Sequence, residues 1–215
     1  MLNHRKISSA VPGRAETLPA SSTQAAVIQA DAHGLEMASV GRAALTVVLF
    51  AGLTALAGQL RVPLPFTPVP LTLQVIPVLL AGAVIGPGGG ACSQALLLIA
   101  GALGMPVFAA GGAGLAHLTG PTGGYLVGFP AAALLVGTLL RARRAPSFGR
   151  VLLAMAAGAV VIHAAGVVHL SIYTGGSLER ALALGSLPFI PGDGLKLLAA
   201  SAIAVGWRRL RESAE

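Results

Sequence analysis

The chain has 215 residues, of which 55% are apolar and only 10% are charged, whereas a soluble domain averages about 25% charged residues. Gly and Pro together make up 20% of the chain but lie within apolar stretches without a collagen period, so the composition excludes fibrous and disordered proteins. The net charge of +7 comes from basic residues at the ends of apolar runs, which indicates membrane topology rather than binding to nucleic acid. A helical protein that crosses the membrane several times remains.

The first 40 residues contain no apolar run of the length found in a signal peptide. We therefore expect residues 1–40 to form a polar cytoplasmic tail ahead of a transmembrane domain, residues 41–215. Because about 20 apolar residues span a bilayer, the pattern predicts an all-α, compact bundle of six transmembrane helices. The expected segments are 43–60, 71–87, 90–103, 122–140, 149–172 and 193–207.

The basic residues are distributed unevenly over this six-helix topology. Eleven of the fourteen lie before the first segment, in the connection between the fourth and fifth segments, or after the last segment. By the positive-inside rule, both termini are expected to be cytoplasmic. The opposite side then carries three connections, 61–70, 104–121 and 173–192. The last two are long, nearly uncharged and rich in Gly or Pro, which favours a lid over a site rather than plain linkers.

Asp193 and Lys196 are candidate binding residues because they lie three positions apart at the start of the last apolar segment. On a helix, this spacing places both side chains on one face. Ionisable groups beside an apolar span are costly and indicate a functional site by default. The alternative is a helix cap at Asp193 and a lysine that reaches the membrane surface. Asp193 is expected to accept from ligand N–H groups, and Lys196 to compensate a negative or polar ligand atom.

Further candidates come from polar and glycine-rich stretches. Gln74 lies inside the second segment, where an amide is expensive unless it is bonded to another helix or to a ligand. In GPTGGYLVGF, Gly123 and Gly124 permit close backbone approach, and the ring of Tyr125 suits either a flat ligand or the membrane interface. Phe108 precedes another glycine-rich run and is a further candidate.

The sequence lacks the motifs of an ATP-binding loop, a zinc protease or a serine hydrolase. His163 and His169 lie six residues apart and so off a common helix face, so packing or hydrogen bonding is expected of them and no metal site is predicted. We therefore expect neither an enzyme nor a cofactor, and energy for transport would come from a partner or a gradient. Ala51 and Ala55 form a small-residue stripe that suits internal packing or the docking of another helix.

Four stretches, PLPFTPVPLTLQ, GMPVFAAGGAG, GPTGGYLVGFP and PFIPGDGLK, occur in this order. Together they resemble the BioY family, the biotin-specific substrate-binding (S) subunits of energy-coupling-factor (ECF) transporters. The resemblance covers residues 43–207. It implies a multi-pass protein of a prokaryotic cytoplasmic membrane that captures biotin and works with a transmembrane coupling (T) subunit and ATPase subunits. It also implies that Ala51 and Ala55 face the coupling subunit. An amide expected in the 108–113 loop is absent.

The resemblance implies a biotin site formed by Asp193, Lys196 and Tyr125, and the sequence does not decide which ligand group meets which side chain. An S subunit for another small vitamin is the nearest alternative. A solitary, ATP-independent carrier, with Asp193 and Lys196 as a relay, is a second alternative. A membrane enzyme is the least favoured, because no nucleophile and base are paired by any motif.

Overall fold

The computed structural model describes residues 22–141 and 146–213, with side chains from residue 39 onward. It divides into two units between Val40 and Gly41. The first long helix, α1 (Ser22–Gln59), runs through that boundary. It therefore begins well before the apolar segment expected at residue 43, while residues 1–21 of the expected tail lie outside the described part of the chain.

Helix α2 (Val75–Ala102) is two helices joined by a sharp turn. Gly86 has φ 81° and ψ 178°, a backbone conformation that favours glycine, and Pro87 follows it. A Cβ added to Gly90 would lie 2.8 Å from the Cα of Gly82, although eight residues of straight helix span about 12 Å. The two halves therefore fold back on each other as a hairpin, as expected for separate second and third segments.

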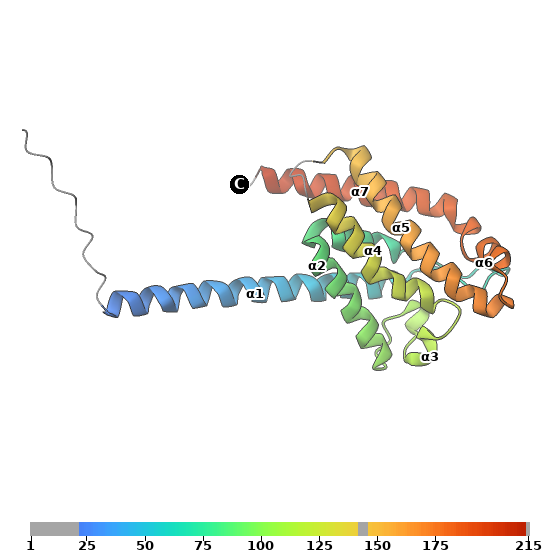
Figure 1. Cartoon of the computed structure of the whole chain (residues 1–215), viewed down its shortest axis with the longest axis horizontal. Helices are drawn as coiled ribbons and strands as arrows, with labels where there is room; N and C mark the ends of the chain where they lie inside the picture. The colour runs from blue at the N-terminus through green and yellow to red at the C-terminus, as the bar shows by residue number, and fades with distance from the viewer. Residues whose placement is uncertain (1–21, 142–145, 214–215) are drawn as a thin grey trace, which may run out of the picture. The chain divides into compact units, whose positions relative to one another are not determined.

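Three more long helices complete the transmembrane domain: α4 (Gly123–Arg141), α5 (Phe148–Ser171) and α7 (Ile190–Glu212). Helix α4 packs extensively against both α2 and α5, and α7 packs against α2 and α5 (Figure 1). Five helices of the described chain are long and apolar enough to cross a membrane. Because one of them, α2, is a hairpin, the domain has the six-helix arrangement predicted from the sequence.

Small residues allow these helices to approach closely. A Cβ on Gly82 would collide with the carbonyl of Ala133 on α4, and a Cβ on Gly137 would lie 2.5 Å from the nitrogen of Pro87. Close backbone approach of this kind is a common way to associate helices in lipid. The core between the helices is apolar and includes Val78, Leu79, Phe129, Ala132, Val136, Met155, Ile162 and Ala200.

The connections expected to form a lid have local structure of their own. Strands β1 (Arg61–Val62) and β2 (Leu71–Thr72) pair antiparallel, and η1 (Ala109–Gly111) and α3 (Leu115–Leu118) follow α2. Between α5 and α7 lie η2 (Ile172–Thr174), α6 (Leu178–Gly185) and η3 (Leu187–Phe189). Figure 1 shows α6 at the end where α5 and α7 are joined. The last helix is longer than the expected segment, 193–207, at both ends.

The small-residue stripe of α1 packs inside the chain. Ala51 is only 7% exposed and belongs to the core, Ala55 packs against it, and Thr54 is fully buried between them. Internal packing, one of the two expected roles of this stripe, is therefore confirmed for both residues, and docking of a coupling subunit at Ala51 and Ala55 stays a prediction. The exposed side of the same helix carries larger residues, including Leu49, Leu53 and Leu56.

Candidate functional site

A cavity lies at the end of the bundle where α2, α4 and α7 begin. Its lining comes from the β2 segment, these three helix starts, the loop before α4, and α5. It contains Thr72, Gln74, Tyr125, Phe129, His163, Phe189, Asp193 and Lys196, together with Ala109, His117 and Thr122 from the loop. The starts of three helices thus bring residues that are far apart in the sequence to one cavity. We call it the inner cavity.

Asp193 and Lys196 form a buried ion pair in the first turns of α7. Lys196 Nζ donates to Asp193 Oδ1 over 2.8 Å, and each residue is 7% exposed. The spacing of three residues brings them to one helix face, as predicted. Because each compensates the other, the pair can persist inside an apolar bundle where a lone charge would be expensive.

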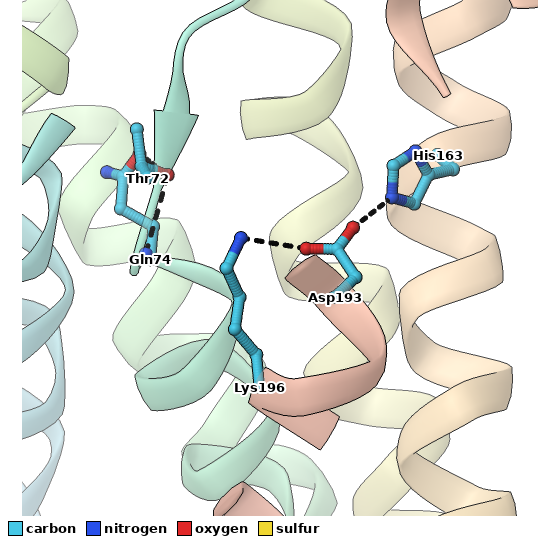
Figure 2. Close-up of polar contacts among 5 residues, drawn as sticks. All are labelled: Thr72, Gln74, His163, Asp193 and Lys196. Carbon is cyan, nitrogen blue, oxygen red and sulfur yellow. Dashed lines mark hydrogen bonds and ion pairs between the residues drawn. The ribbon is translucent and has the colours of Figure 1, made fainter. Parts of the chain in front are cut away.

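His163 of α5 binds the other oxygen of the same carboxylate. Its Nε2 lies 2.7 Å from Asp193 Oδ2. Figure 2 shows that Lys196 and His163 approach Asp193 from opposite sides. Each carboxylate oxygen has about two lone-pair directions, so both oxygens of Asp193 can still accept from a ligand. Lys196 likewise has three N–H donors, of which Asp193 takes one.

Gln74 lies on the α2 side of the inner cavity and is loosely held. It is 4% exposed, yet its Nε2 is 3.5 Å from the carbonyl of Thr54 and its Oε1 is 3.5 Å from the hydroxyl of Thr72. Figure 2 shows both residues on the far side of Lys196 from His163. Hydrogen bonds at that distance are weak. The amide therefore remains able to bind a ligand more tightly than it binds its present neighbours.

Tyr125 contributes a wall to the cavity while its hydroxyl is already used. The hydroxyl donates to the carbonyl of Gly185 over 2.7 Å, and the ring packs on Gly166, where a Cβ would collide with it. The ring also stands edge-on to His163, with centroids 6.1 Å apart. Tyr125 therefore offers a flat apolar surface and ties α4 to α6.

Phe108, Gly123 and Gly124 do not line the inner cavity. Phe108 is fully buried and stacks on His117, while a Cβ on Gly123 or Gly124 would collide with Leu118 or His169. These three residues build the walls of the site, and direct ligand contact by them stays a prediction. Next to Phe108, the residue that reaches the cavity is Ala109.

The loop that lacks the expected amide is held by Gln59, at the end of α1. Gln59 Nε2 donates to the carbonyl of Phe108 over 3.1 Å, and its Oε1 accepts from the N–H of Gly111 over 2.9 Å. Between them Ala110 adopts φ 63°, a left-handed conformation that costs a non-glycine residue energy. Both polar ends of Gln59 are therefore engaged in shaping the turn, and Gln74 is the side-chain amide of the cavity lining.

Sequence reasoning missed His163 and His117 as site residues. His163 was expected only to pack or form a hydrogen bond, and its partner, Asp193, is 30 residues away on another helix. His117 carried no signal alone, but it lines the inner cavity. His169 lies elsewhere, with Nε2 2.9 Å from the carbonyl of Gly120. The sequence did offer one signal for His163, because it is an ionisable residue within an apolar segment.

Comparisons with known proteins agree with this architecture. The model of the BioY family matches residues 29–213, so the chain belongs to the BioY family, as the sequence motifs predicted. The "Probable biotin transporter BioY" of Pyrococcus horikoshii is 42% identical over 159 residues, covering 74% of this chain and 91% of that protein. The "Biotin transporter BioY" of Thermotoga maritima is 39% identical, covering 69% and 86%, respectively.

A solved structure shows the same fold. It is the crystal structure of the S-component for biotin from an ECF-type ABC transporter, with a TM-score of 0.74 and 27% sequence identity. The match covers 81% of this chain and 93% of that one. The chain is thus a multi-pass membrane protein, as expected from its apolar segments, and it has the S-component fold that the resemblance implied.

Proposed function

We propose that this BioY-family protein captures biotin in the inner cavity and serves as the substrate-binding subunit of an ECF-type uptake system. The observation that carries this proposal is the buried cluster of Asp193, Lys196 and His163, which shares with Gln74 a cavity whose remaining lining is mostly apolar and aromatic. Biotin presents a ureido group with two N–H donors and one carbonyl, an apolar bicycle and a carboxylate. The cavity supplies acceptors, donors and flat apolar walls that match the ureido ring and the bicycle.

The geometry favours the ureido ring beside the ion pair. Asp193 Oδ1 and Lys196 Nζ are only 2.8 Å apart, so they meet the same end of a ligand. A ureido group places an N–H and a carbonyl side by side, which suits Asp193 as acceptor and Lys196 as donor. The ligand carboxylate at this position would lie against the carboxylate of Asp193. The aromatic residues Tyr125, Phe129 and Phe189 then surround the bicycle.

The proposed function also requires a defined orientation in the membrane and a source of energy. The distribution of basic residues supports cytoplasmic termini, and in that orientation the inner cavity lies near the outer face of a prokaryotic cytoplasmic membrane. Energy for transport is supplied by separate ATPase subunits through a transmembrane coupling subunit. A solitary carrier is distinguished by uptake into liposomes that contain the purified chain alone and no ATP.

The proposal is tested by titrating the purified protein with biotin, desthiobiotin, thiamine and riboflavin. Biotin is expected to bind with one-to-one stoichiometry and much more tightly than thiamine or riboflavin. Lys196→Met is expected to weaken biotin binding by about 2–4 kcal/mol, because it removes a donor and leaves Asp193 without its buried charge partner. Asp193→Asn is expected to cost about 1.5–3 kcal/mol, the value of a charged hydrogen bond.

The control is thermal stability of both variants in the absence of ligand. If Asp193 only caps α7 and Lys196 only reaches the membrane surface, both variants should bind biotin with normal affinity and differ from the wild type in stability. Normal affinity in both would remove Asp193 and Lys196 from the site. Tighter binding of thiamine or riboflavin than of biotin would instead assign another vitamin to the cavity.

A further inference from the structure

A second cavity opens directly outside the inner one. It is lined by Arg61, Pro68 and Pro70 of the β1–β2 segment and by residues 109–122 of the loop before α4. Four residues, Pro70, Ala109, His117 and Thr122, line both cavities. The two spaces are therefore neighbours that share a wall. The volume of the outer cavity, about 440 Å³, is several times that of the inner cavity, about 70 Å³.

The position of Arg61 is set by strand pairing. Arg61 on β1 is directly opposite Thr72 on β2, and residues opposite each other in an antiparallel pair have their side chains on the same face. Thr72 lines the inner cavity and Arg61 lines the outer one. The short ribbon thus borders both cavities: Thr72 on β2, which contacts Gln74, lines the inner cavity, and Arg61 on β1 lines the outer cavity.

The charges of the two cavities differ. In the inner cavity, Lys196 is compensated by Asp193. In the outer cavity, burial lowers the pKa of His117 from its ordinary value, so His117 is neutral at pH 7 and Arg61 supplies the positive charge. Within the part of the chain that the structure describes, no ion pair involves Arg61. An anionic group therefore gains more in the outer cavity than beside Asp193.

We infer that the outer cavity receives the carboxylate end of the ligand and that Arg61 is its charge partner. This inference rests on the proposed function: a biotin whose ureido ring meets Asp193 and Lys196 must direct its four-methylene chain away from them. The chain then passes the shared wall of Ala109, His117 and Thr122 and places the carboxylate near Arg61. A guanidinium can bind a carboxylate through two parallel N–H donors. It also attracts an anionic ligand during its approach.

The test compares biotin with biotinamide, its neutral carboxamide, on the full-length protein. The wild type is expected to prefer biotin by about three- to tenfold, the range of a partly exposed Arg–carboxylate pair. Arg61→Gln is expected to lower affinity for biotin to that for biotinamide and to leave biotinamide binding unchanged. Arg61→Lys should restore part of the preference. Arg180→Gln is the matched control, because Arg180 is an exposed arginine on α6 that lines neither cavity.

Rapid-mixing measurements give a second readout. The association rate of biotin with the wild type is expected to fall as salt is raised, and this dependence should be much weaker in Arg61→Gln and for biotinamide. Equal affinity of the wild type for biotin and biotinamide would overturn the inference. An equal loss of affinity for the two ligands in Arg61→Gln would overturn it as well. Failure of both ligands to bind the wild type would overturn the proposed function itself, and the inference with it.

Discussion

His163 gives the Asp193 carboxylate a fixed direction. With Lys196 on Oδ1 and His163 on Oδ2, the carboxylate is held from two helices and cannot rotate without losing a hydrogen bond. Among the described residues, the buried Nδ1 of His163 has no hydrogen-bond partner. A neutral ring with its proton on Nε2 fits this environment, because an N–H at Nδ1 would be a buried donor without an acceptor. His163 is thus a positioning residue for Asp193.

Replacing His163 tests this role. His163→Leu is expected to weaken biotin binding by about 1.5–3 kcal/mol, because the carboxylate loses a charge-assisted hydrogen bond and its fixed orientation. His163→Gln, which keeps an N–H donor, should recover part of that loss. Isothermal titration of both variants measures the effect.

The ligand dependence separates positioning of Asp193 from other effects. Because Asp193 is proposed to meet the ureido end of the ligand, His163→Leu should lower the affinity for biotin and the affinity for biotinamide equally. Arg61→Gln, in contrast, should affect biotin alone. Normal affinity of His163→Leu with lowered thermal stability would assign His163 a purely structural role.

Site residues whose polarity conflicts with their apolar surroundings could be predicted from the sequence. Asp193, Lys196 and Gln74 each interrupt an apolar segment, and the structure places all three in one cavity. The partnership of His163 with Asp193 could not be predicted, because it depends on the register of α5 against α7. Gly123 and Gly124 illustrate the converse difficulty. The sequence does not distinguish a glycine that helix packing requires from a glycine that a ligand requires.

At the level of whole elements, the hairpin of α2 shows how a turn can be held inside a membrane domain. In a regular helix the carbonyl of Ala83 accepts from the N–H of residue 87, but Pro87 has no N–H. Arg208 of α7 supplies the missing donor: its Nη2 lies 2.9 Å from the Ala83 oxygen. Its positive charge also lies at the C-terminal end of the first half-helix, where the helix dipole favours a cation.

Removal of this contact should destabilise the domain. Arg208→Met keeps most of the side-chain length but leaves the Ala83 carbonyl without that donor, so we expect a loss of about 1.5–3 kcal/mol in stability. Arg209→Met, at the exposed neighbouring position, is the matched control. Thermal unfolding in detergent compares the two variants, and equal melting temperatures would show that the hairpin does not depend on Arg208.

The turn itself was predictable from sequence, whereas its partner was not. Gly86 and Pro87 interrupt the apolar pattern and mark a boundary between two segments. The arginine that binds there is 125 residues away, and in the sequence it is one of several basic residues after the last segment. Local backbone chemistry thus indicates where helices end, but contacts between helices decide which basic residue stabilises each end.

For the whole molecule, the hairpin determines the parity of membrane crossings. If α2 were one straight span, the described chain would cross five times and its two ends would lie on opposite sides. With α2 folded back at Gly86, the number of crossings is even. The position of Gly41 in α1 and the connection before α5 then lie on one side, and the cavities with α6 lie on the other. The positive-inside rule predicts that the first of these sides faces the cytoplasm.

Cysteine accessibility tests this arrangement. In a Cys92→Ser background, single substitutions Gly41→Cys, Ser147→Cys and Ala183→Cys place a thiol at exposed positions in α1, before α5 and in α6. A membrane-impermeant maleimide added to intact cells is expected to label Ala183→Cys alone. The other two should be labelled only after the cells are opened, because they share the cytoplasmic side. Labelling of Gly41→Cys and Ser147→Cys from opposite sides would show that α2 crosses the membrane without turning back, which would contradict the six-helix topology and with it the proposed position of both cavities on the outer side.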